Sequence, residues 1–187
     1  FVCDIDDWAL RDYEKIPNIN IITNHVTATG SAAPLNMAAM MLLDDSQYDH
    51  YDFFGFMGDD HLPKTQFWDY RLRLLLPMDK NGIAYGNDLL QGQNLPTAAL
   101  LSRGIIQTLK GMTQPGTKHL YFDNFWKQLG TDIQGLYYDH SIIIEHMHPL
   151  ARKAAMDDHY ARVNSRQYYD HDREVYEAYI NSQDYKI

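Results

Sequence analysis

The chain has 187 residues, 45% of them hydrophobic, and a formal net charge of −9, which fits one domain with a sizeable core. An acidic surface repels phosphate backbones and the basic residues are scattered, so we expect no broad binding to nucleic acid. The single cysteine, Cys3, excludes a disulfide within the chain and favours a reducing, cytoplasmic location. No apolar run reaches the roughly 20 residues of a membrane helix, so we expect no membrane partner.

The first half of the chain alternates short apolar strands with helices. In chain order we expect strand 1–5, helix 9–15, strand 19–23, helix 34–43 and strand 51–57. The run INIIT at 19–23 is apolar at almost every position, which is typical of a strand in a parallel sheet. A parallel α/β domain rarely opens directly in a strand, so we expect the chain to be a fragment or to lack a first β-α unit.

The second half continues the alternation. In chain order we expect helix 65–76, strand 82–86, a helix within 95–108, strand 119–122, helix 123–130, a strand pair over 134–145 and a helical tail over about 150–187. Together the two halves predict one α/β domain over residues 1–187. Its sheet is expected to be mostly parallel, with helices on both faces.

Two adjacent carboxylates, Asp59 and Asp60, follow the apolar strand YDFFGFM. Parallel α/β sheets place ligands at the carboxyl ends of their strands. A hard divalent cation accepts carboxylate oxygens and keeps coordination positions free for substrate phosphates. The alternative is a loop in which one aspartate caps a helix and the other is solvated. The pair is therefore a candidate cation site.

Two histidines, His146 and His148, follow the apolar run SIII within EHMHP. Residues two apart point to the same side of an extended strand, and neutral imidazole is a common metal ligand. One of them could complete a site with Asp60. The alternative is a surface pair, or a histidine packed in the core.

Two further aspartates are candidates with weaker support. Asp123 begins the expected helix DNFW, where it either caps the helix or acts as a general base for an acceptor hydroxyl. Asp6 follows the first strand, where it either contacts a nucleoside or lies in a solvated turn.

In order, the chain has a strand ending in acidic residues (VCDIDD), a glycine turn and a helix with an asparagine (TGSAAPLNMAAM), then FFGFMGDDHLP, DNFW and EHMHP. This ordered set resembles the family 2-like GT-A glycosyltransferases. It is similar to the compact glycosyltransferase-like proteins of bacteriophages, over nearly the whole chain to about residue 160. Gly58 stands where a full Asp-x-Asp motif has its first acidic residue.

The resemblance implies a GT-A, Rossmann-like fold and a metal-dependent transfer of sugar from a nucleoside diphosphate sugar, a UDP-sugar first, to an acceptor hydroxyl. The transfer would invert the anomeric configuration, in the host cytoplasm if a phage encodes the chain. Asp60 would bind Mn²⁺ or Mg²⁺, with His146 or His148 as a further ligand and His148 slightly preferred. Asp59 would bind the donor ribose or the metal, Asp6 would contact the nucleoside, and Asp123 would be the base.

Two other functions remain open from the sequence. A GT-A-like module could bind carbohydrate or a protein partner without catalysis. A nucleotidyltransferase also uses paired carboxylates and a metal, but it needs a basic, glycine-rich loop after a strand. We expect neither Arg103-Gly104 nor Lys110-Gly111 to follow a strand, which disfavours that enzyme class.

Overall fold

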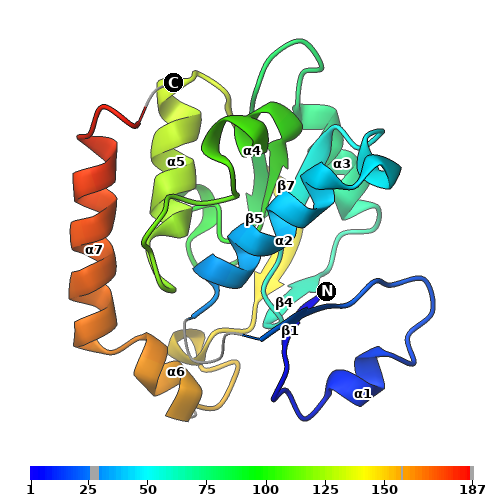
Figure 1. Cartoon of the computed structure of the whole chain (residues 1–187), viewed down its shortest axis with the longest axis vertical. Coiled ribbons are helices and arrows are strands. Elements are labelled where there is room, and N and C mark those ends of the chain that lie inside the picture. The colour runs from blue at the N-terminus through cyan, green and yellow to red at the C-terminus, as the bar shows by residue number, and fades with distance from the viewer. Residues whose placement is uncertain (26–29, 157, 186–187) are drawn as a thin grey trace.

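The computed structural model describes residues 1–25, 30–156 and 158–185. The protein is an α/β structure in which helices pack on a five-stranded sheet, and a separate two-stranded sheet lies near one edge (Figure 1). The strands are β1 (Val2–Asp4), β2 (Ile22–Asn24), β3 (Phe53–Phe56), β4 (His61–Pro63), β5 (Ile83–Asn87), β6 (Ala99–Ser102) and β7 (Leu136–His146).

The helices occupy the segments between these strands and the C-terminal part of the chain. They are α1 (Leu10–Tyr13), α2 (Ala32–Asp44), α3 (Trp68–Leu75), α4 (Arg103–Leu109), α5 (Phe122–Asp132), α6 (Asp158–Val163) and α7 (Arg166–Ile180). Short 3₁₀ turns cover η1 (Ser46–Tyr48), η2 (Gly92–Asn94) and η3 (Pro149–Ala151). No helix in the described ranges is both long enough and apolar enough to cross a membrane.

The large sheet is mixed, so the expected mostly parallel arrangement is not confirmed. Its order is β3-β6-β5-β7-β4. Only β5 and β7 pair in parallel, while β3–β6, β5–β6 and β4–β7 are antiparallel. The small sheet consists of the parallel pair β1–β2. Two strands that the sequence did not predict, β4 and β6, account for the antiparallel pairs.

Several expected elements differ from those observed. The segment 95–108 contains β6 before α4, and 134–145 lies in the single strand β7 instead of a strand pair. Residues 119–122 were wrongly predicted as a strand. Arg103 directly follows β6, contrary to expectation. Its guanidinium donates to Asp49 at 3.0 Å and to the carbonyl of Tyr48 at 2.9 Å.

Two apolar clusters hold the layers together, one on each face of the sheet. On one face, α2, α4 and α5 pack on the sheet around Ile83, Ile106 and Trp126. On the other face, α3 covers Ala84 and the β7 isoleucines. Ile83 and Ala84 are neighbours on β5 and are fully buried, because successive strand residues point to opposite faces. Burying both faces of β5 makes it the central strand of the fold.

A bulge in the β5–β7 pair sets the end of β7 in register. Gly86 pairs with Asp139, but the next residue, Asn87, pairs with Ile143. A Cβ at Gly86 would lie 2.3 Å from the Ile142 carbonyl oxygen, so only glycine permits this approach. The residues of β7 that follow Ile143 lie past the end of β5, and they pair with β4.

A buried carboxylate ties α7 to the loop before α5. Asp172 is fully buried, and its oxygens accept the backbone amides of Lys118, His119 and Leu120 at 3.0, 2.9 and 2.7 Å. The sequence predicted a strand here, but these backbone amides donate to the Asp172 side chain instead of to a neighbouring strand. Their hydrogen-bonding capacity is therefore satisfied without a sheet. The second half of the expected helical tail is therefore anchored to the body of the protein.

Replacing Asp172 with Asn should destabilise the protein by about 2 kcal/mol or more, because the three buried N–H groups are divided between both carboxylate oxygens and an amide keeps only one of these acceptors. The exposed Asp170 on the same helix pairs with Arg166 and Arg173, and Asp170→Asn should cost less than about 1 kcal/mol. Urea unfolding of both variants measures the difference. Equal stability of the two variants would contradict the anchoring role.

The loss of stability in Asp172→Asn should also depend on pH. Burial raises the pKa of Asp172, but the three amide hydrogen bonds outweigh burial and hold it below the ordinary value. The stabilisation is therefore present above the pKa of about 3.9 in the unfolded chain and is lost as the pH falls through the native pKa. The deficit of Asp172→Asn should shrink in acid.

Candidate metal site

The pairing of β4 with β7 brings together residues that are far apart in the sequence. His61 lies directly opposite His146 in the antiparallel register, and opposed residues project to the same face of a sheet. Asp60 immediately precedes β4, and its carbonyl accepts the amide of Met147 at 2.7 Å. Pro63 is tolerated in β4 because this is an edge strand.

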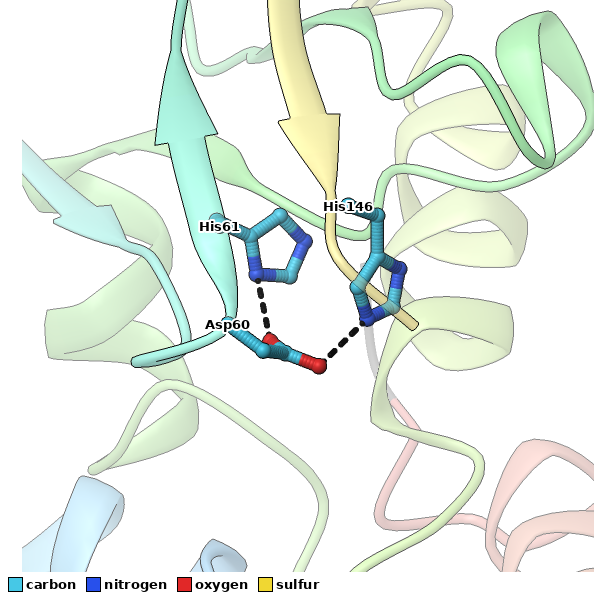
Figure 2. Close-up of side chains that lie close together, drawn as sticks. All are labelled: Asp60, His61 and His146. Carbon is cyan, nitrogen blue, oxygen red and sulfur yellow. Dashed lines mark hydrogen bonds and ion pairs between the residues drawn. The ribbon is translucent and has the colours of Figure 1, made fainter. Parts of the chain in front are cut away.

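The carboxylate of Asp60 bridges the two imidazoles, with one oxygen directed at each ring (Figure 2). Its Oδ1 is 3.1 Å from Nδ1 of His61, and its Oδ2 is 2.9 Å from Nε2 of His146. The two rings stack with centroids 4.2 Å apart and planes inclined by 20°. One donor atom from each of the three residues lies within 4.8 Å of the others, a spacing that one cation could span.

The burial of His61 supports its role as a metal ligand. Its side chain is only 4% exposed, and its Nδ1 faces the Asp60 carboxylate at 3.1 Å. Its buried Nε2 has no hydrogen-bond partner among the described residues. A buried polar atom left without a partner costs roughly 1–3 kcal/mol, so such atoms are rare in native proteins. A cation bound by Asp60, His61 and His146 would satisfy this donor set, and the residues present therefore fit a metal.

The charges at the site reinforce one another. Burial raises the pKa of Asp60, but hydrogen bonding and the charges of His146 and His61 outweigh it and hold that pKa far below its usual range. Burial lowers the pKa of His146, but Asp60 and Asp88 outweigh it and raise that pKa to about 9. Without a metal, His146 is thus a cation at neutral pH, and metal binding must displace its proton.

His148 belongs to the surroundings of the cluster and not to the three residues whose donor atoms converge. Its ring lies edge-on to that of His146, with centroids 4.7 Å apart. Its Nε2 is 2.9 Å from the hydroxyl of Tyr160 on α6. Burial lowers the pKa of His148, and the positive charge of His146 lowers it further. The sequence slightly favoured His148 as the ligand, but the geometry favours His146, because it is the donor atom of His146 that converges with those of Asp60 and His61.

The two predicted donor-binding aspartates outside the cluster are exposed. Asp59 is not among the three residues whose donor atoms converge, and Asp6 lies in the turn after β1. Asp59 and Asp7 both raise the pKa of Tyr13, behind the larger effect of burial. The end of β1 and the Asp59 segment therefore lie near each other, although Asp6 itself is not placed against Asp60.

Asp123 lies in the first turn of α5, half-buried, where its Oδ1 accepts the amide of Asn124 at 2.8 Å. Burial raises its pKa, and Asp88 raises it further, against the opposing effects of Asn124 and His146. The carboxyl is thus close enough to the cluster to sense its charges. A raised pKa makes the carboxylate a stronger base than an ordinary aspartate.

The sequence analysis assigned no role to His61 or Asp88. His61 stands in the quoted segment GDDH, but its segment was expected to be a loop. Its opposition to His146 becomes visible only in the β4–β7 pairing. Asp88 follows β5 within YGNDLL, a segment without a recognisable spacing. It lies 3.8 Å from Nδ1 of His146.

Comparisons of the chain with protein-family models, with curated proteins and with solved structures yield no match. The function is therefore argued from the site alone and from the sequence pattern.

The two histidines should titrate on opposite sides of the ordinary value near 6.5. In chelator-treated protein, nuclear magnetic resonance should place the pKa of His146 near 9 and that of His148 below 6.5. Because the native pKa of His146 exceeds the unfolded value, its stabilisation is complete below about pH 6.5 and is lost as the pH rises through 9. A His146 pKa at or below that of His148 would contradict the described contacts.

Proposed function

We propose that the protein is a metal-dependent, inverting glycosyltransferase of the GT-A type, acting on a nucleoside diphosphate sugar. The convergence of Asp60, His61 and His146, with the His61 ring buried and its Nε2 without a hydrogen-bond partner among the described residues, is the observation that carries the proposal. The ordered motifs of the sequence and the proximity of Asp123 to the same charges support the reaction class.

Asp60, His61 and His146 would hold the cation, one donor atom each. When bound, a divalent cation offsets negative charge on the diphosphate of a nucleotide donor. The protein itself has a net charge of −9, so its own surface does not favour a diphosphate. This is the physical reason for placing the donor at the cation.

Asp123 would accept the proton of the acceptor hydroxyl while that oxygen forms its bond to the anomeric carbon and the bond to the diphosphate breaks. Attack from the face opposite the leaving group inverts the anomeric configuration. The elevated pKa of Asp123 favours this proton transfer. Asp59 and the end of β1 border the donor's nucleoside in this arrangement, with Asp6 in the adjoining turn.

Two imidazoles in the donor set favour Mn²⁺ over Mg²⁺, because Mg²⁺ prefers oxygen ligands whereas transition metals accept nitrogen. Calorimetric titration should show Mn²⁺ binding about tenfold or more tightly than Mg²⁺. His61→Gln and His146→Gln should remove this preference, while His148→Gln should keep it. A preference for Mg²⁺ over Mn²⁺ would argue against the assigned ligands. A preference for Mn²⁺ that only His148→Gln removes would do so too.

Activity can be tested by following nucleoside diphosphate release from a panel of nucleotide sugars, UDP-sugars first, with Mn²⁺ and diverse hydroxyl acceptors. Asp123→Asn should lower turnover about 10²- to 10⁴-fold, the usual contribution of a general base, while donor and Mn²⁺ affinity stay within about threefold. Asp60→Asn should lose Mn²⁺ binding itself. Asp132→Asn, an exposed aspartate at the other end of α5, is the matched control and should retain activity.

The other outcomes of this assay identify the alternatives. Cation-dependent binding of a carbohydrate without turnover of any donor would support a non-catalytic binding module. Release of pyrophosphate from a nucleoside triphosphate in the presence of a sugar phosphate would support a nucleotidyltransferase. Full activity of Asp123→Asn would remove the base from the mechanism.

A further inference from the structure

Asp88 is a buried carboxylate with partners on two sides. It follows β5 directly and is 2% exposed. Its Oδ1 accepts the backbone amides of Leu90, Gln91 and Gly92 at 2.9, 2.7 and 2.8 Å. Its Oδ2 accepts the hydroxyl of Thr97 at 2.9 Å. These bonds hold the carboxylate in one orientation, since four donors converge on it.

The same residue contacts His146 through backbone and side chain. The carbonyl of Asp88 accepts the amide of His146 at 3.0 Å, and Oδ2 lies 3.8 Å from its Nδ1. That nitrogen is buried and has no hydrogen-bond partner in the part of the chain that the structure describes. The opposite nitrogen, Nε2, faces Asp60 at 2.9 Å. The imidazole therefore lies between two carboxylates, one at each ring nitrogen.

We propose that Asp88 is the positioning residue of the metal site: it keeps the proton of neutral His146 on Nδ1, so that the lone pair of Nε2 points to the cation. This inference rests on the proposed cation site. Metal-binding histidines commonly give their second ring N–H to a carboxylate, which fixes the tautomer and the ring orientation. A 3.8 Å separation becomes a hydrogen bond with a small rotation of the imidazole. Such a rotation would give Nδ1 of His146 a hydrogen-bond partner in Asp88.

Asp88 also joins the metal site to the loop that follows β5. Leu89 adopts a left-handed backbone, with φ of 58°, a conformation that costs a non-glycine residue energy. The hydrogen bonds that the backbone amides of Leu90, Gln91 and Gly92 donate to Asp88 hold the loop in this conformation. One buried carboxylate thus sets both the imidazole orientation and the path of this loop.

The variant Asp88→Asn separates these two roles. The amide oxygen can still accept the three loop amides, so the fold of the loop is kept. Its NH₂ group cannot accept a hydrogen bond from Nδ1–H and would favour the tautomer with the proton on Nε2. A protonated Nε2 cannot bind the metal. Thr97→Val is the matched control, because it removes a bond to the same Oδ2 without changing the charge or the acceptor facing His146.

Calorimetric titration with Mn²⁺ alone should show about 10- to 100-fold weaker binding for Asp88→Asn and a change within about threefold for Thr97→Val. Hydrogen exchange of the amides of residues 90–92 should stay protected in Asp88→Asn, which shows that the loop is intact. Unchanged Mn²⁺ affinity in Asp88→Asn, with wild-type protein binding Mn²⁺, would overturn the inference and leave the proposed cation site standing.

A second readout does not depend on metal. In metal-free wild-type protein, the Nδ1–H proton of His146 should give a resonance protected from exchange with water, and Asp88→Asn should lose it. If the wild-type protein bound no Mn²⁺, the proposed function would fail while this resonance still tested the Asp88–His146 pairing. An Nδ1–H resonance equally protected in both proteins would contradict that pairing.

Discussion

The contact between Asp60 and His146 is the constraint on which the account depends. These residues are 86 positions apart and meet at 2.9 Å, because β4 pairs with the end of β7. That pairing uses the end of β7 that lies past Asn87, and the bulge at Gly86 fixes which residues of β7 lie there. The core on both faces of β5 therefore contributes to the site by fixing where β7 ends. A fold that lost this register would separate the carboxylate from the imidazoles.

The parts of the fold with strong local patterns could be predicted from the sequence. The apolar run before Asp59 forms β3, and the segment that begins at Asp123 lies in α5. The convergence of Asp60 with a histidine of EHMHP also followed from placing both segments at strand ends. These predictions depended on local composition and on a general rule about where ligands bind in α/β sheets.

What could not be predicted depends on partners distant in the sequence. The three residues of β4 have a proline and little apolar content, so only pairing with β7 makes them a strand. His61 becomes a candidate ligand through that pairing. The carboxylate of Asp88 accepts hydrogen bonds from nearby backbone amides and from Thr97, and no residue spacing in the sequence predicts its approach to His146. The mixed sheet has the same origin, because β4 and β6 provide its antiparallel pairs.

The site combines opposing electrostatic demands in a small volume. Two buried or half-buried carboxylates, Asp60 and Asp88, hold one imidazolium between them in the metal-free protein. In the proposed metal-bound state, a divalent cation would replace the proton as the positive charge of the cluster. The neighbouring Asp123 senses the same charges, which links its basicity to the state of the cluster.

The most direct test of the central claim is anomalous diffraction from crystals of the protein grown with Mn²⁺. The account predicts one strong anomalous peak bonded to Asp60, His61 and His146, and its disappearance in Asp60→Asn. An ordered Mn²⁺ bound elsewhere on the protein, or no peak between these three side chains at saturating Mn²⁺, would contradict it.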